Sequence, residues 1–377
     1  MRTEVMKMLD LEAPIFAFSH CRDVVAAVSR AGGMGVLGTT HVTPEQLDIE
    51  LAWLNAHTED KNYGVDLMFA SDARQEFERM NIGDVDKYIP EEHRRFVDAL
   101  MKKYGVPELP PGEREALFDE YMKGMIRTHK SAEARLEVLF KHPKAKVMAS
   151  ALGVPPAHVT DACHERDIKV IGMVGRPKHV RRHKEAGMDI IVSAGHEAGG
   201  HVGEIAGLVL TPQVVEEADP IPVLHAGGIA RGKQIAAAVA LGAQGVWTGT
   251  IWLGTSEAET TPLVKEKIFA ATSADTLRSK CGTGHPARRL RSAWVEAWEA
   301  DGAPKPLPMP LQSILVNEAL ERMDRYQPQE LVSYPAGQGV GMMHEQTDVR
   351  SVFLDLLTEY GETMEGMSNM FQQFDEG

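Results

Sequence analysis

The residues best suited to chemistry lie in one glycine-rich stretch. Residues 195–203 read GHEAGGHVG and follow the apolar run MDIIVSA at 188–194. His196 and His201 place two imidazoles in a loop with little side-chain bulk. Glu197 could orient a ligand, but bracing the turn by accepting backbone N–H bonds is the favoured role. The glycines allow the backbone to lie close to a flat ligand.

Two further glycine loops follow later apolar runs. Gly227 and Gly228 precede a helix expected to begin near Ala230, and Gly249 and Thr250 end the next run. A helix N-terminus offers unpaired N–H groups and a partial positive charge, and glycine lets a ligand approach them, so such loops bind phosphate. No Walker motif is present, and a sugar phosphate or FMN fits the loops better.

Eight short apolar runs would position these loops. They are nearly continuous rather than alternating, which is typical of parallel strands buried on both faces. We expect strands at 13–18, 34–38, 63–70, 146–152, 169–174, 188–194, 221–227 and 245–250. Eight such strands with helices between them predict a (β/α)8 TIM barrel. An open doubly wound sheet is disfavoured, because no G-x-G-x-x-G follows an early strand.

Two segments lie outside a minimal barrel. Residues 71–145 are charged and helix-forming, with breakers in GVPELPPGE at 105–113, and they predict a helical insertion after the third strand. Residues 256–377 are expected to form a helical cover over the barrel mouth, including the glycine-rich PAGQGVGMMH at 335–344. The expected organisation is therefore a ligand-binding barrel over 1–255, with its insertion, and a C-terminal helical segment packed on it.

Composition limits the class of protein. The 377 residues carry a net charge of −14 without a long basic stripe, which argues against a nucleic-acid partner. Cys21, Cys163 and Cys281 are far apart and odd in number, so we expect reduced cysteines, no zinc or other metal site, and a cytoplasmic location. No signal peptide and no apolar run of about 18 residues is present, so no membrane contact is expected.

In these loops the chain resembles the nitronate monooxygenase family, formerly called 2-nitropropane dioxygenases. FMN-dependent enoyl-ACP reductases of the FabK type are related to that family. The resemblance rests on PIFAFSHCRDVVAAVSRAGGMGVLG (14–38), GHEAGGHVG (195–203), PVLHAGGIARGKQIAAAVALGAQGVWTGTIWLGTSEAE (222–259) and GTGHPARRLRS (282–292). E-A-G-G-H followed by A-G-G-I and a G-T strand end is specific in that order.

The resemblance implies a TIM barrel that binds FMN. The FMN phosphate would be held by backbone groups of Gly227, Gly228, Gly249 and Thr250. His201 matches the family's active-site histidine near the reactive edge of the flavin, where it can hold the nitro oxygens of a nitronate. Further cofactor contacts are expected at Ala17, Ser193, Glu197, Gly199 and Gly200.

Three features depart from the family pattern. Ser19 and His20 stand where apolar residues are common, and His196 stands where a small or apolar residue usually precedes the glutamate. The insertion at 71–145 is longer than a minimal relative needs and could reshape substrate access. We expect His20 and His196 to line the substrate pocket.

The substrate is left open by these features. The first expectation is oxidation of alkyl nitronates with O2 as co-substrate. The alternative is an NAD(P)H-dependent FMN reductase of an enoyl or acyl thioester or of a quinone, in which Arg288 and Arg289 could meet a nucleotide phosphate. A phosphate-binding barrel without redox activity is the third reading, and a homodimer is compatible with all three.

Overall fold

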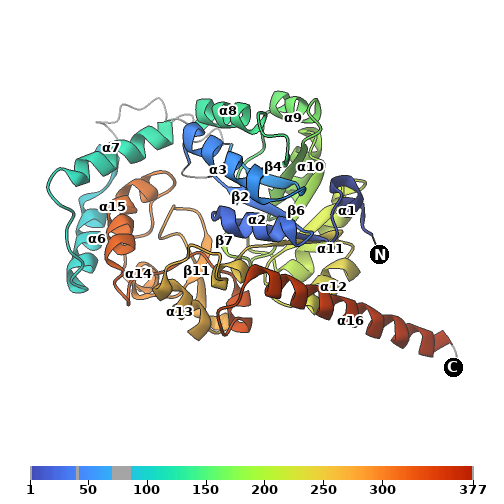
Figure 1. Ribbon diagram of the computed structural model, residues 1–377. Coiled ribbons are helices and arrows are strands. Elements are labelled where there is room, and N and C mark those ends of the chain that lie inside the picture. The colour runs from blue at the N-terminus through green and yellow to red at the C-terminus, as the bar shows by residue number, and fades with distance from the viewer. Residues whose placement is uncertain (1, 40–41, 70–85, 127, 376–377) are drawn as a thin grey trace.

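A closed parallel barrel forms the centre of the computed structural model, which describes residues 2–39, 42–69, 86–126 and 128–375 (Figure 1). Its strands are β1 (Ile15–Ser19), β2 (Met34–Gly38), β3 (Tyr63–Asp66), β4 (Ala145–Ser150), β5 (Lys169–Val174), β6 (Ile190–Ala194), β8 (Val223–Ala226) and β9 (Gly245–Thr248). Ile15 of β1 pairs with Val246 of β9, which closes the barrel. The predicted (β/α)8 fold is therefore confirmed, with a strand in each of the eight predicted runs.

Helices alternate with these strands on the outside of the barrel. They are α2 (Arg22–Arg30), α3 (Pro44–His57), α9 (Ala157–His164), α10 (Val180–Glu185), α11 (Gly207–Ala218) and α12 (Gly232–Ala240). Helix α3 begins with a capping box, in which Thr43 and Gln46 satisfy each other's backbone N–H groups. Val25, Leu51 and Val65 illustrate the continuous apolar core that helices and strands share.

The barrel interior is packed with side chains and is not a channel. Phe16 and Trp247 stack inside it, with ring centroids 6.3 Å apart. Helix α1 (Glu4–Leu9) adds Val5 and Leu9 to the same cluster. A ligand must therefore bind at the ends of the strands, and the glycine loops place it at their carboxyl ends.

The insertion after β3 is helical where the structure describes it. It contains η1 (Asp86–Tyr88), α6 (Glu91–Lys103), α7 (Glu113–Ile126) and α8 (Thr128–Leu139). Helix α8 packs on α3, whereas α6 and α7 pack on helix α15 (Leu311–Tyr326) of the C-terminal segment. The start of the predicted insertion, at 71–85, lies outside the described residues.

The C-terminal segment is mainly helical, as predicted, but it also contributes strands. Its helices, besides α15, are α13 (Pro262–Ala270), η4 (Ser273–Asp275), α14 (Ala293–Glu299), η5 (Gln338–Met342) and α16 (Val349–Asp375), and the short helix η3 (Thr250–Gly254) leads into it from β9. An antiparallel hairpin, β10 (Thr276–Ser279) and β11 (Ala287–Leu290), was not predicted. Its β11 pairs with β7 (Gly200–His201), so it joins the loop after β6 in a three-stranded sheet.

Helix α16 packs on α12 and α2, and its last turns extend away from the rest of the molecule (Figure 1). None of the described helices is both long enough and apolar enough to cross a membrane.

Candidate active site

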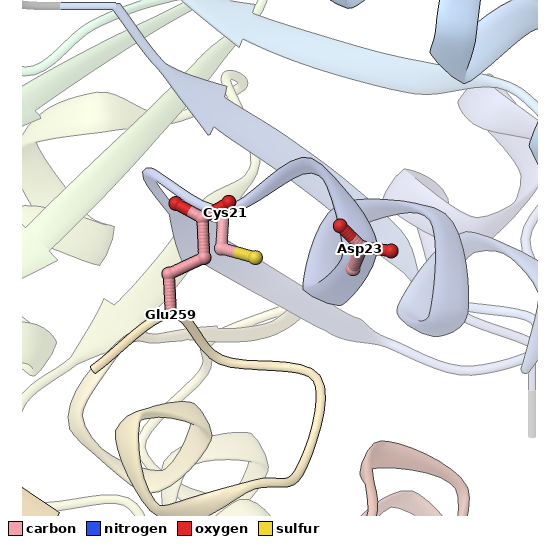
Figure 2. Close-up of side chains that lie close together, drawn as sticks. All are labelled: Cys21, Asp23 and Glu259. Atoms are coloured by element: carbon pink, nitrogen blue, oxygen red, sulfur yellow. The ribbon is translucent and has the colours of Figure 1, made fainter. Parts of the chain in front are cut away.

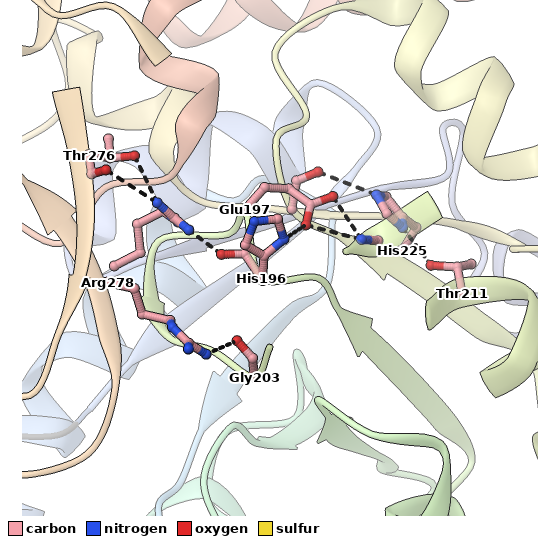
Figure 3. Close-up of polar contacts among 10 residues, drawn as sticks. His196, Glu197, Gly203, Thr211, His225, Thr276 and Arg278 are labelled. Atoms are coloured by element: carbon pink, nitrogen blue, oxygen red, sulfur yellow. Dashed lines mark hydrogen bonds and ion pairs between the residues drawn. The ribbon is translucent and has the colours of Figure 1, made fainter. Parts of the chain in front are cut away.

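The loop after β6 is braced by Glu197. Both carboxylate oxygens of Glu197 accept the N–H of Gly207, at 3.0 Å each, and Gly207 is the first residue of α11 (Figure 3). The negative charge lies at a helix N-terminus, where the unpaired N–H groups and the helix dipole stabilise it. Glu197 therefore has the bracing role that the sequence favoured.

His201 lies on β7, where the hairpin of the C-terminal segment fixes its backbone. Its partner across the sheet is Ala287 of β11. The Nε2 atom of His201 lies 2.8 Å from Oγ1 of Thr283, and its ring lies edge-on to that of His285, with centroids 6.4 Å apart. A half-buried imidazole is thus held by a hydroxyl from a segment about 80 residues later in the chain.

His196 is held differently from His201. Its Nδ1 lies 3.4 Å from Oε2 of Glu197, which makes an ion pair when the imidazole is protonated. That nitrogen has no hydrogen bond of good geometry among the described residues. The side chain of His196 is 37% exposed, so it is open to a ligand from outside.

Two arginines of the hairpin have structural partners. Arg288 is buried and donates from Nε to the carbonyl oxygen of His196 at 2.8 Å and from Nη1 to Thr276. Burial, and next the neighbouring charge of Arg278, lowers the pKa of Arg288. Arg289 donates to Ser333. The expectation that Arg288 and Arg289 meet a nucleotide phosphate therefore finds no support in this arrangement.

The predicted phosphate loops present open backbone. Gly227 and Gly228 have φ values of +128° and +69°, which strongly favour glycine. A Cβ on Gly249 would meet only the carbonyl oxygen of Phe18, at 3.9 Å, and one on Gly200 would meet nothing within 4 Å. These positions leave room for a group lying against the backbone, so the residues present fit the expected flavin.

The helix after these glycines does not supply the expected anion site. Helix α12 begins at Gly232, two residues after the predicted start. The N–H groups at this end are already bound: those of Ala230 and Arg231, just before the helix, donate to Gln234 Oε1, and that of Gly232 donates to Glu359 Oε2 at 2.7 Å. This part of the expectation was wrong, because a carboxylate from α16 occupies the helix N-terminus.

The glycine-rich stretch of the C-terminal segment belongs to the site. The N–H of Gly337 donates to Thr250 Oγ1 at 2.9 Å, and that of Gln338 donates to the carbonyl oxygen of Glu197. A Cβ on Gly199 would lie 2.8 Å from the nitrogen of Gly337, so the two backbones touch. Sequence reasoning assigned this stretch only to a cover, although its PAGQG pattern was the signal for a close backbone contact.

His20 lies at the mouth of the barrel, and its place in the substrate pocket stays a prediction. Its Nδ1 donates to the carbonyl oxygen of Gly38 at 3.0 Å, and its ring lies edge-on to Phe18, with centroids 5.2 Å apart. The side chain is exposed, so a ligand at the mouth can reach it.

The side chains of Ala17 and Ser193 point away from the mouth. Ala17 packs in the core between the barrel and its outer helices. Ser193 Oγ lies 3.1 Å from Thr211 Oγ1 of α11. That hydroxyl lies 2.7 Å from Nδ1 of His225, and Figure 3 shows these two residues. Contacts of Ala17 and Ser193 with a cofactor would therefore have to be made by the backbone.

His225 completes this buried chain of hydrogen bonds. Its Nε2 lies 3.3 Å from the carbonyl oxygen of Gly227, which can only accept, so Nε2 carries the proton. Burial lowers the pKa of His225, so the ring is neutral and Nδ1 accepts from Thr211. This series of hydrogen bonds links β6, α11 and β8 beneath the glycine loop.

Sequence reasoning missed Asp66, at the carboxyl end of β3. Its side chain is buried, and Oδ1 accepts the N–H of Ala151 at 2.8 Å. Burial raises the pKa of Asp66 to about 7, although the Ala151 N–H and the charge of Arg135 act in the opposite direction. The barrel mouth therefore contains a carboxyl group that titrates near neutral pH.

Cys21, Asp23 and Glu259 bring their donor atoms within 4.8 Å of one another near the start of α2 (Figure 2). The Sγ of Cys21 donates to the carbonyl oxygen of Glu257 at 3.0 Å. Burial raises the pKa of this thiol, and metal ligation requires the thiolate. The cluster is therefore a poor metal site.

Comparisons with known proteins agree with this geometry. A family model described as nitronate monooxygenase matches residues 8–359. A Mycobacterium tuberculosis protein named "Putative monooxygenase Rv1533" is 45% identical over 384 residues, covering 99% of this chain and 100% of that protein. A Staphylococcus saprophyticus protein named "Probable nitronate monooxygenase" is 30% identical over 308 residues, covering 78% of this chain and 79% of that protein.

Solved structures of similar fold cover nearly the whole chain. FabK from Thermotoga maritima matches with a TM-score of 0.71 and 26% identity, covering 98% of this chain and 99% of that one. Nitroalkane oxidase from Streptomyces ansochromogenes matches with a TM-score of 0.79 and 25% identity, covering 96% of this chain and 99% of that one.

Proposed function

We propose, from the premise that the chain belongs to the nitronate monooxygenase family, that it oxidises small alkyl nitronates with O2 and uses FMN to do so. Membership makes the chain a flavin-dependent oxidoreductase. The observation that supports the finer proposal is the position of His201, which is held at the barrel mouth next to open glycine backbone.

The cofactor would be held mainly by backbone groups. The residues that would hold it are Glu197, Gly199, Gly200, Gly227, Gly228, Gly249 and Thr250. Because the N-terminus of α12 is occupied by Glu359, the phosphate would rely on the glycine loops after β8 and β9. When bound, FMN would supply the electron-transfer chemistry that no side chain can perform.

His201 would bind and orient the substrate. A nitronate is already an anion, so no base has to remove a proton from carbon. An imidazole can donate a hydrogen bond to the nitro oxygens, and the bond to Thr283 fixes the ring for that task. Glu197 is committed to Gly207, which leaves His20 and His196 to line the space where the substrate enters.

The test measures oxygen uptake by purified yellow protein with ethyl nitronate, 2-propyl nitronate and propionate 3-nitronate, without NAD(P)H. His201→Asn should keep the flavin and lose at least 100-fold in turnover, on the order of what one positioned catalytic hydrogen bond contributes. His158→Asn, at an exposed site on α9, is the matched control. Absence of oxygen uptake with every nitronate would overturn the proposal.

A second candidate is an NAD(P)H-dependent reductase of an enoyl or acyl thioester or of a quinone. The similarity to FabK over 98% of the chain favours it. Anaerobic mixing with NADH or NADPH separates the candidates: rapid bleaching of the flavin selects the reductase, whereas bleaching by nitronates alone selects the monooxygenase. Protein that stays colourless after reconstitution with FMN would exclude both.

The proposal also includes a cytoplasmic location and small-molecule partners only. Cys21, Cys163 and Cys281 are buried and free, as is usual in a reducing compartment. A homodimer is the proposed assembly, and light scattering of the flavin-loaded protein tests it.

A further inference from the structure

A cavity outside the candidate active site lies between the β10–β11 hairpin and the turn that follows α14. Its volume is about 410 Å³, within the usual range for small-molecule sites. Charged side chains line it from both sides: Arg278 and Lys280 from the hairpin, and Glu299, Asp301 and Lys305 from α14 and the turn. None of these residues has a part in the proposed function.

The charges around this cavity do not neutralise one another by direct contact. Within the described part of the chain, the ammonium groups of Lys280 and Lys305 form no ion pair, and neither do the carboxylates of Glu299 and Asp301. Arg278 is different, because its Nη2 atom forms an ion pair with Oε1 of Glu204 at 3.5 Å. Two cations and two anions facing one cavity suit a ligand that carries both an anionic group and hydroxyl groups.

Trp298 forms part of the cavity wall, and its side chain is 3% exposed. The indole ring also offers an apolar surface to a flat group.

We propose that this cavity binds the phosphorylated ribose of a nucleotide. Lys280 and Lys305 bind the phosphate, and the carboxylates of Glu299 and Asp301 accept the ribose hydroxyls. The ring of Trp298 forms an apolar part of the wall. The chemistry is common to dinucleotide cofactors and to coenzyme A, so the experiment distinguishes these sources.

The cavity is connected to the candidate active site through the hairpin. Arg278, on its wall, donates to the carbonyl oxygen of Gly203 at 2.6 Å, two residues after His201. Strand β11 pairs with the strand that carries His201. A nucleotide seated here lies next to the sheet that holds the active-site histidine. The site goes beyond the proposed function. Binding at this site can be measured without turnover of a nitronate.

The experiment is calorimetric titration of the full flavin-loaded chain with adenosine 2′,5′-bisphosphate, adenosine 3′,5′-bisphosphate and inorganic phosphate. Lys280→Ala and Lys305→Ala should each weaken bisphosphate binding about tenfold or more, as expected for a charge-assisted contact. Trp298→Phe keeps an aromatic ring in the wall and should leave binding nearly unchanged. Lys141→Ala, at an exposed lysine between α8 and β4, is the matched control.

Tighter binding of the 2′,5′-bisphosphate identifies an NADP(H)-type ligand, and tighter binding of the 3′,5′-bisphosphate identifies a coenzyme A-type ligand. Binding of neither bisphosphate at millimolar concentration overturns the site. Equal binding of inorganic phosphate, or equal weakening by Lys141→Ala, also overturns it. Oxygen uptake with nitronates should be unchanged in Lys280→Ala and Lys305→Ala, so this site and the proposed function can fail separately.

Discussion

At the scale of single residues, the two histidines of the loop after β6 have different partners. His201 is bonded to a hydroxyl, whereas Nδ1 of His196 lies near a carboxylate. The hydroxyl of Thr283 fixes the ring of His201, which suits that residue to orienting the substrate. His196 lies beside Glu197 and is partly exposed, which suits it to adjusting substrate preference.

Thr283 should act as a positioning residue for His201. Thr283→Val removes the hydroxyl and keeps the shape, so the imidazole loses its anchor, and turnover of nitronates should fall about tenfold or more. Thr283→Ser should restore most of the activity. If Thr283 had a merely structural role, Thr283→Val would lower the unfolding temperature and leave the pH profile of turnover unchanged. We expect an unchanged unfolding temperature and a changed pH profile.

Gly249 should be needed for the cofactor and not for the fold. An added Cβ meets only the carbonyl oxygen of Phe18, at 3.9 Å, and the φ of Gly249 is −139°. The free energy of unfolding of Gly249→Ala should therefore lie within about 1 kcal/mol of that of the parent protein. The methyl group would occupy space that the phosphate needs, so FMN affinity should fall about tenfold or more, measured by fluorescence titration. Gly361→Ala, at an open position on α16, is the control. Unchanged FMN affinity would place the phosphate elsewhere.

Asp66 should make the protein less stable as the pH rises towards neutral. Its pKa in the folded protein, about 7, lies above the ordinary value of 3.8, so the unfolded chain releases this proton first. The resulting loss of stability begins near pH 4 and is complete above pH 7. Asp66→Asn keeps an acceptor for Ala151 and should raise the free energy of unfolding by roughly 2–4 kcal/mol at pH 8. Urea titrations at pH 4 and pH 8 check this, with no gain expected at pH 4.

Much of the site could be predicted from local sequence, and the rest depends on distant contacts. His201 and the glycines were identifiable, because the chemistry lies within one short stretch. Thr283, Gly337 and Asp66 were missed, because each matters only through a neighbour far away in the chain. Whether the side chain of a strand residue faces inward depends on the register of the strand in the barrel. The local sequence does not give this register, so it did not show that the side chain of Ser193 points outward.

At the scale of elements, helix α16 is clamped to the N-terminus of α12. Glu359 accepts two bonds from Arg231 and one from the N–H of Gly232, and Lys233 lies 3.3 Å away. Burial alone would raise the pKa of Glu359, but these donors outweigh it and hold the pKa at about 2. The carboxylate thus takes the place of the anion that the sequence predicted for this helix.

Glu359→Gln should therefore weaken the clamp in a pH-dependent way. The neutral amide cannot form an ion pair with Arg231. The free energy of unfolding should therefore fall by about 1–3 kcal/mol at pH 7. Because the folded pKa is depressed, this contribution is fully present above about pH 4.5 and is lost as the pH falls through about 2. Chemical denaturation at pH 7 and pH 3 measures the trend, and Glu362→Gln, on an exposed part of the same helix, should have no effect.

At the scale of the whole molecule, the barrel and the C-terminal segment share one core. Phe353 and Leu356 of α16 are buried in the same cluster as Ile15 and Val246 of the barrel. A sequence boundary near residue 255 therefore separates two parts of one packed unit. We propose that residues 1–255 and 256–377 unfold together.

Phe353→Ala should destabilise both parts equally. Removing a buried phenyl ring costs about 3–5 kcal/mol, and loss of tryptophan fluorescence, of helical circular dichroism and of bound flavin should shift to lower denaturant together. Leu354→Ala, the next residue but 61% exposed, should change little. Two separate transitions in the parent protein would contradict the shared core.

The fold was predictable at this scale because every barrel strand is a local apolar run. The hairpin was not, because β10 and β11 are four residues each and β7 is two. Such short strands leave no periodic pattern, and their pairing is decided by contacts across the molecule. The helical cover was predicted, but its role in building the site was not.

The contact of Gly337 with Thr250 and Gly199 also sets an order of events during synthesis. A ribosome adds the last barrel strand roughly 90 residues before it reaches this glycine, a delay of several seconds at about 5–20 residues per second. Because α16 also belongs to the barrel core, the core and the cofactor cradle are both completed only when the C-terminal segment has been made.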